Sequence, residues 1–157
     1  MNFPILSSLI LLPAVGALFL FFTRSNKENN ITVKYVALFT SLVNFFLSVY
    51  LWILFDQSTS EFQFVEDRVW IKDLINYKVG IDGISILFIV LTTFITPLCI
   101  ISVNNSIKNR LSEFLIAILI MESFMIGVFC SLDLVVFYLF FEAGLIPMFL
   151  IIGIWGG

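Results

Sequence analysis

Five uninterrupted apolar stretches run through this chain of 157 residues, and each is long enough to cross a lipid bilayer. The hydrocarbon core of a bilayer is about 30 Å thick, so a helix needs about 20 apolar residues to span it. Backbone polar groups have no water partners in that core, which favours helices over strands, and the stretches lack the alternation typical of outer-membrane barrels. The sequence therefore predicts an all-α, polytopic membrane protein with one membrane domain. Its five transmembrane helices are expected at residues 3–22, 33–55, 81–103, 114–132 and 134–155.

The composition excludes most classes of water-soluble protein. Hydrophobic residues make up 61% of the chain and charged residues only 12%, whereas soluble domains are roughly half apolar and a quarter charged. A net charge of −3 offers no basic surface for nucleic acid. The chain has no His, and Cys99 and Cys130 both fall inside apolar runs. We therefore expect two buried packing thiols and no zinc, haem or iron–sulfur site.

Positively charged residues are unevenly distributed between the connections. Five Lys and Arg residues lie in or beside the short segments 23–32 and 104–113, and three lie in the longer segment 56–80. Because the inner loops of membrane proteins carry the excess of Lys and Arg, we expect the short segments inside and segment 56–80 on the outer side, with the N-terminus. Alternating residues at 61–65 predict a small hairpin or an interfacial turn there.

Two glutamates lie in the middle of apolar stretches, Glu122 in the fourth and Glu142 in the fifth. A charge at the bilayer centre costs about 2.5–3.5 kcal/mol on insertion scales. Such a carboxyl must be protonated, pair with a cation from another chain, or face water, since no Lys or Arg lies mid-span in this sequence. One interpretation is a proton relay at Glu142, with Glu122 as a weaker second candidate. The other is a protonated Glu that makes an interhelical hydrogen bond for packing alone.

Pro147 lies five residues beyond Glu142. A proline inside a helix leaves the carbonyl four residues earlier without its donor, and here that carbonyl belongs to Ala143. We expect Pro147 to open the helix beside the carboxyl, where a water chain could use the free carbonyl; a simple kink is an equally good interpretation. At the start of the third helix, Asp82 is expected to cap the backbone.

Two motifs carry a resemblance to a known family. Residues 80–85 read Gly-Ile-Asp-Gly-Ile-Ser, and residues 137–148 read Phe-Tyr-Leu-Phe-Phe-Glu-Ala-Gly-Leu-Ile-Pro-Met, followed at 153–156 by Gly-Ile-Trp-Gly. With these motifs the chain resembles, over nearly its whole length, the N-terminal part of the antiporter-like, proton-pumping membrane subunits of respiratory complex I. That family comprises mitochondrial NADH dehydrogenase subunit four and bacterial NADH–quinone oxidoreductase chain M.

The resemblance implies that Glu142 is an essential proton-channel carboxylate, paired in the family with a lysine on the seventh helix; it assigns no universal role to Glu122. It also implies a membrane-arm subunit of a proton-translocating NADH:ubiquinone oxidoreductase, with no redox chemistry in this chain. NADH, FMN, iron–sulfur clusters and quinone would be held by partner subunits. Other membrane-arm subunits and membrane lipids would be its partners. Because the family has further helices, we expect a split or truncated form in which a separate chain supplies helices six to fourteen and the lysine.

The predicted location is the mitochondrial inner membrane, with the bacterial plasma membrane as the alternative, because the start of the chain lacks the Arg-rich pattern of a transit peptide. Two other functions stay open at this point. A subunit of a multi-chain sodium/proton antiporter would share the fold and the glutamate of the fifth helix. A non-transport membrane scaffold would use both glutamates for packing only.

Overall fold

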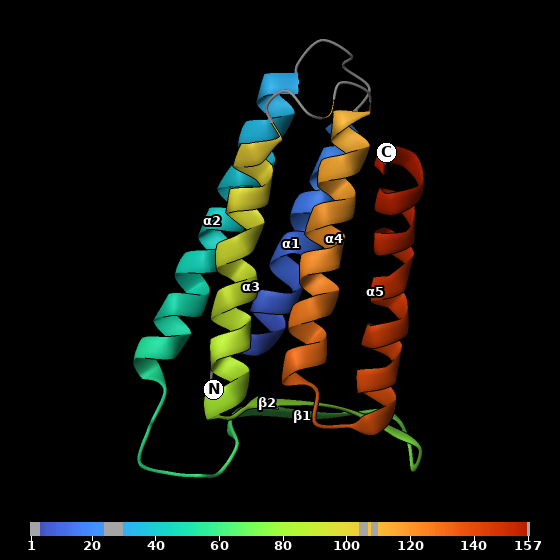
Figure 1. The fold of residues 1–157 in the computed structure, drawn as a ribbon. Coiled ribbons are helices and arrows are strands. Elements are labelled where there is room, and N and C mark those ends of the chain that lie inside the picture. The colour runs from blue at the N-terminus through green and yellow to red at the C-terminus, as the bar shows by residue number, and fades with distance from the viewer. Residues whose placement is uncertain (1–3, 24–29, 104–106, 108–109, 157) are drawn as a thin grey trace.

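The computed structural model describes residues 4–23, 30–103, 107 and 110–156. Five helices form a bundle, and a two-stranded sheet lies across one end of it (Figure 1). In chain order the elements are α1 (Ile5–Thr23), α2 (Asn30–Leu54), β1 (Gln63–Ile71), β2 (Ile75–Ile81), α3 (Gly83–Ser102), α4 (Leu111–Cys130) and α5 (Leu134–Trp155). All five helices are long and apolar enough to cross a membrane. The predicted class, an all-α polytopic membrane protein, is confirmed.

The ends of the helices differ from the expected ranges by a turn or less. The third helix begins at Gly83 rather than at residue 81, because Gly80 and Ile81 belong to β2. Asp82 caps this helix as predicted: its carboxylate accepts hydrogen bonds from the backbone N–H groups of Ser85 (2.8 Å) and Ile84 (3.1 Å). The hydrogen bond from Ser85 is the main reason why the pKa of Asp82 lies below its ordinary value.

The segment at 56–80 contains the expected hairpin. β1 and β2 pair antiparallel from Gln63 opposite Ile81 to Ile71 opposite Ile75. The hairpin is also joined to the turn between α4 and α5, where the backbone N–H of Leu132 donates to the carbonyl of Lys78 (2.9 Å). It therefore holds together the helix ends at its side of the bundle.

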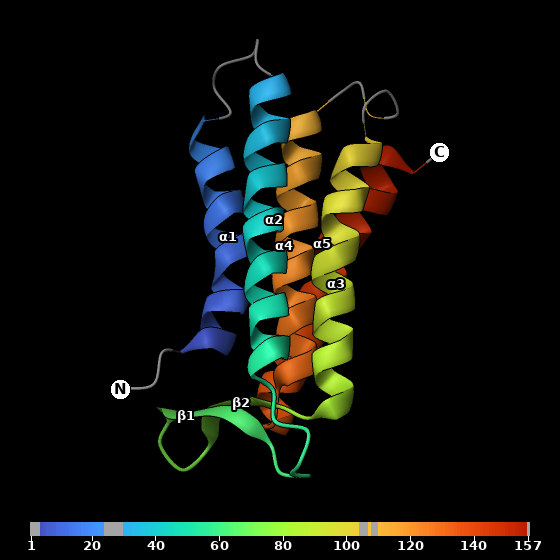
Figure 2. The same cartoon turned by 90° about the vertical axis from the view of Figure 1, so that its left-hand side faces the viewer.

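The helix α4 is the centre of the bundle. It packs against α1, α2, α3 and α5 and touches β2, whereas α5 lies at one edge and packs chiefly against α4 (Figures 1 and 2). Close approach between α1 and α2 depends on Gly16, since a Cβ there would lie 2.5 Å from Cγ2 of Thr40. Cys130 is buried as expected, but Cys99 is exposed; the prediction for Cys99 was wrong because it lies on an outward side of α3.

The hairpin and the α4–α5 turn lie at one end of the bundle, and segments 23–32 and 104–113 connect helices at the other. Three of the five positive residues behind the predicted orientation, Arg24, Lys27 and Lys108, lie outside the described residues. Which end faces inward stays a prediction.

Candidate functional site

Glu122 is enclosed within the bundle. It lies on α4 with only 2% of its surface exposed. The side-chain amide of Asn44, on α2, donates a hydrogen bond of 3.0 Å to its Oε1. The buried Thr96, on α3, lies near this carboxyl without a direct hydrogen bond to it. Three helices that are distant in sequence therefore meet at one carboxyl group.

Polar side chains of α2 form a buried stripe that faces this site. Ser41, Asn44 and Ser48 follow one another at a spacing of three and four residues, and all three are fully buried. Such spacing places side chains on one face of a helix. Ser48 Oγ lies 2.6 Å from Thr93 Oγ1 on α3, so the stripe makes contact with α3 as well as with α4. The sequence analysis missed Asn44, although this spacing of polar residues in an apolar helix was a visible signal.

Ser123, the residue after Glu122, contacts α1 from another side of α4. The hydroxyl of Ser123 donates to the backbone carbonyl of Ile10 in α1, three residues before Pro13, which lies inside that helix. A helix is weakened near a proline because one of its own hydrogen bonds is lost. Ser123 therefore joins α4 to α1 within one turn of Pro13.

Glu142 has a different environment. It is exposed on α5, a helix in which only Val136 and Pro147 are buried among the described side chains. Within the part of the chain that the structure describes, no hydrogen bond or ion pair reaches its carboxylate. Val136 and Pro147 are 11 residues apart (147 − 136), which is close to three turns, so they share a face, and Glu142 lies on the opposite face.

The structure does not bring the two glutamates together, although their depths match. Eight residues separate Glu122 from Cys130 at the end of α4 (130 − 122), and eight separate Leu134 at the start of α5 from Glu142 (142 − 134). At 1.5 Å per residue both lie about 12 Å from the turn. Glu122 points towards α2 and α3, and Glu142 points away from the bundle.

Pro147 is buried on the face of α5 that packs against the bundle. Its position leaves the carbonyl of Ala143 without the usual donor, but the proline ring and the carboxylate of Glu142 lie on different faces. The structure therefore does not place Pro147 directly beside the Glu142 side chain. A role of Pro147 in opening the helix stays a prediction.

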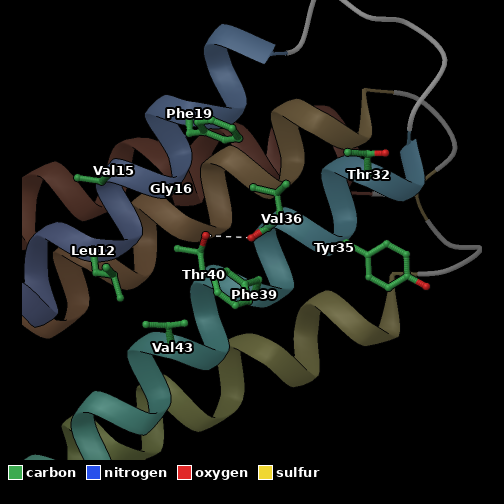
Figure 3. Close-up of a pocket in the computed structure, with 10 residues that line it drawn as sticks. All are labelled: Leu12, Val15, Gly16, Phe19, Thr32, Tyr35, Val36, Phe39, Thr40 and Val43. Atoms are coloured by element: carbon green, nitrogen blue, oxygen red, sulfur yellow. Dashed lines mark hydrogen bonds between the residues drawn. The ribbon is translucent and has the colours of Figure 1, made fainter.

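Two open grooves lie between the elements of the bundle. Figure 3 shows the first, a groove of about 570 Å³ between α1 and α2, in which the Thr40 hydroxyl donates to the carbonyl of Val36 in its own helix (2.9 Å). None of its lining side chains is charged. The second, of about 900 Å³, lies between α1, the hairpin, α4 and α5, and Arg68 is its only charged lining residue. Neither Glu122 nor Glu142 lines these grooves.

At the hairpin end, a small polar cluster holds α1. Glu66 of β1 accepts hydrogen bonds from the backbone N–H (3.0 Å) and the hydroxyl (2.7 Å) of Ser7, and that hydroxyl lies 2.9 Å from the phenol oxygen of Tyr77. Burial is the main reason why the pKa of Tyr77 is raised above its ordinary value of 10.0. Among the described residues no three His, Cys, Asp or Glu side chains gather as a metal site would need.

Comparison with known proteins finds close relatives along the whole chain. It is 48% identical to NADH-ubiquinone oxidoreductase chain 4 of Marchantia polymorpha, over 96% of this chain and 30% of that protein. It is 46% identical to NADH-quinone oxidoreductase subunit M of Rickettsia conorii, over all of this chain and 33% of that protein, and 59% identical to the subunit M of Rhodobacter capsulatus, over 79% of this chain and 24% of that protein. The chain thus spans about a third or less of the length of these relatives. No protein-family model matches the sequence.

Proposed function

We propose that this chain, whose homologues over its whole length are chain 4 and subunit M of NADH–quinone oxidoreductases, forms the N-terminal part of a membrane-arm subunit of a proton-translocating NADH:ubiquinone oxidoreductase. In this function it carries part of a proton channel that is coupled to electron transfer elsewhere in the complex. It resides in the inner membrane of a mitochondrion or in the plasma membrane of a bacterium.

The observation that carries the proposal is the exposure of Glu142 at mid-span on the open face of α5. A carboxylate at that depth costs several kcal/mol when it faces lipid alone, so this face must be covered by groups that hold or hydrate it. Because no described residue of this chain does so, we infer a partner outside the described residues. The resemblance implies a lysine as this partner, and both the lysine and its assignment to a separate chain stay predictions.

Glu142 acts as the proton-carrying group in this proposal. When a lysine ammonium lies close to the carboxylate, the opposite charges attract and the ionised form is favoured. When the lysine moves away, the isolated carboxylate loses that attraction and takes up a proton, which neutralises it. A cycle of approach and withdrawal therefore releases one proton and loads another, and conformational change in the rest of the complex would drive it.

The redox groups lie outside this chain in the proposal. Flavin, iron–sulfur clusters, NADH and quinone are held by partner subunits, and this chain assembles with other membrane-arm subunits and with membrane lipids. Electrons would never pass through the five helices, so the chain's own contribution is confined to protons.

Proton translocation by the assembled complex tests the role of Glu142. In Glu142→Gln, the side chain keeps its shape but loses its titration, and we expect NADH-driven proton uptake into membrane vesicles to fall on the order of 100-fold. Glu61→Gln, in the exposed segment before β1, is the matched control and should pump normally. Unchanged translocation per NADH in Glu142→Gln would refute the assigned role.

Identification of the chains that purify with this one tests the complex itself. Flavin and iron–sulfur subunits in the preparation would support the proposal. Several small membrane subunits without redox centres would show a sodium/proton antiporter instead. If Glu142→Leu leaves every transport activity intact, the chain is a membrane scaffold.

A further inference from the structure

The hydrogen bonds around Glu122 are incomplete. Glu122 Oε1 accepts from the amide of Asn44, but Glu122 Oε2 and Asn44 Oδ1 are both buried and have no hydrogen-bond partner among the described groups. A buried polar atom without a partner costs about 1–3 kcal/mol, and more when it is charged. If Glu122 were a carboxylate, its negative charge would rest on a single neutral donor.

No described positive charge compensates such a carboxylate. Besides Glu122, the five helices carry three charged side chains among their described residues: Lys34, Glu113 and Glu142. Lys34 lies ten residues before Asn44 on α2 (44 − 34), about 15 Å along the helix, and its ammonium group donates to the carbonyl of Ile101. The other two are acidic, and the faces of α1 and α3 bring no charge at all.

Thr96 offers an acceptor in place of a donor. Its hydroxyl hydrogen is directed to the carbonyl of Thr92, one turn earlier in α3, at 3.0 Å. A hydroxyl has one hydrogen but two lone pairs, so Thr96 Oγ1 remains able to accept a hydrogen bond from the neighbouring carboxyl. Only a carboxyl that carries its own proton can supply that bond.

We propose that Glu122 is a proton-binding site that stands as a neutral carboxylic acid, with Asn44 and Thr96 as its positioning residues. The acid donates through Oε2–H to Thr96 Oγ1 and accepts at Oε1 from the Asn44 amide. Every contact comes from within this chain, so the inference goes beyond the proposed function and does not depend on the role of Glu142.

The position of this acid also separates it from Glu142. Phe124 and Gly127 face α5, where both contact Phe140. These positions follow Glu122 by two and five residues, which turns them well away from it around α4. The body of α4 therefore lies between the two glutamates, and no direct proton transfer links them.

Infrared difference spectroscopy of the complete membrane complex that contains this chain tests the inference. The spectrum of the wild type minus that of Glu122→Gln should contain the C=O stretch of a protonated carboxylic acid, with a small downward shift in D2O. Thr96→Val keeps the side-chain shape but removes the acceptor, so the band should shift to higher frequency. Thr96→Ser should retain the wild-type position, and Glu142→Gln should leave the band in place whether or not proton translocation is lost.

Each outcome of these infrared measurements either supports or overturns the proposal. A difference spectrum in which Glu122→Gln removes carboxylate bands, or removes no carboxylic acid band, would overturn the proposal. If Glu122→Gln does not assemble, Asn44→Val and Thr96→Val test the proposal, because each removes one hydrogen bond to the acid. If both variants keep the carboxylic acid band of the wild type unchanged, the proposal is overturned. Loss of proton translocation in Glu142→Gln bears on the proposed function alone.

Discussion

The two helices α4 and α5 are neighbours in sequence and in space, each carries one glutamate at mid-span, and yet their surroundings differ. Half of the most apolar part of α4 is buried within this chain, whereas only 11% of the corresponding part of α5 is. The chain encloses Glu122 with its own amide and hydroxyl groups and leaves Glu142 on an open face. Identical residue types at matching depth therefore have different surroundings: this chain encloses one glutamate, and no described residue of the chain reaches the carboxylate of the other.

The asymmetry follows from where small and polar residues lie on each helix. On α4, Gly127 admits the ring of Phe140 from α5, and Ser123 reaches the backbone of α1. On α5, Gly153 has no neighbouring atom within 4 Å of where a Cβ would lie. A small residue without a neighbour is free to admit another helix, as small residues do at helix contacts in membranes. The open face of α5 therefore carries both a small residue without a neighbour, Gly153, and the exposed Glu142.

The contact between α4 and α5 gives the largest expected effect on stability. A Cβ at Gly127 would lie 2.7 Å from the ring of Phe140, and a Cβ at Gly153 would meet nothing. Both glycines are helical, so the gain in helix propensity on substitution by Ala is common to both. Gly127→Ala should therefore be less stable than Gly153→Ala by about 1–3 kcal/mol, from overpacking. Thermal unfolding midpoints in one detergent measure the difference, and equal midpoints would show that Phe140 yields without cost.

Removing each glutamate in turn tests the comparison itself. Glu122→Leu leaves the Asn44 amide buried without its acceptor and should lower the free energy of unfolding by about 1–2 kcal/mol. Glu142→Leu loses no described contact within this chain and should leave the stability of the five-helix unit unchanged. Thermal unfolding of the isolated chain in detergent compares the two variants. A larger loss in Glu142→Leu would mean that α5 has partners inside this chain after all.

Much of this architecture could be predicted from the sequence because the governing forces are local. Twenty consecutive apolar residues specify a spanning helix whatever their neighbours are, and Asp82 before a helical run specifies a cap. Gly80 is explained only by the structure: a Cβ there would lie 2.8 Å from Cδ1 of Leu132, which belongs to a turn 52 residues later (132 − 80). Gly83, in the same motif, has no such neighbour.

The partner of Glu122 could not be predicted in the same way. Asn44 and Glu122 are 78 residues apart, and lipid-facing and helix-facing positions have similar hydrophobicity in a membrane protein. Apolar patterning therefore carries little information about which faces meet. The polar stripe on α2 marked one buried face, but only the packing shows that α4 rather than lipid or another chain covers it. Glu142 illustrates the opposite case, where the residue stands out in the sequence and no described residue of this chain contacts its carboxylate.

The contact between Tyr77 of the hairpin and Ser7 of α1 is expected to have the smallest effect on stability, and that effect should depend on pH. The Ser7 hydroxyl donates to Glu66, so the phenol of Tyr77 is the donor in the contact with Ser7. Tyr77→Phe removes that one hydrogen bond and should cost about 0.5–1 kcal/mol at neutral pH. Because burial raises the pKa of Tyr77 in the folded chain above 10.0, the protonated form favours folding; its contribution is complete below pH 10 and is lost as the pH rises through the folded value.

Wild type should therefore lose stability between pH 10 and the raised pKa of Tyr77, where deprotonation breaks the bond to Ser7 and places a second negative charge near Glu66. Tyr77→Phe should lack this part of the alkaline loss, while Tyr50→Phe, at an exposed position of α2, should keep it. Unfolding midpoints of the three proteins measured from pH 8 upwards provide the comparison. Parallel curves for wild type and Tyr77→Phe would show that the hairpin holds α1 through Glu66 alone. The phenol of Tyr77 would then contribute nothing to the stability of this end of the bundle.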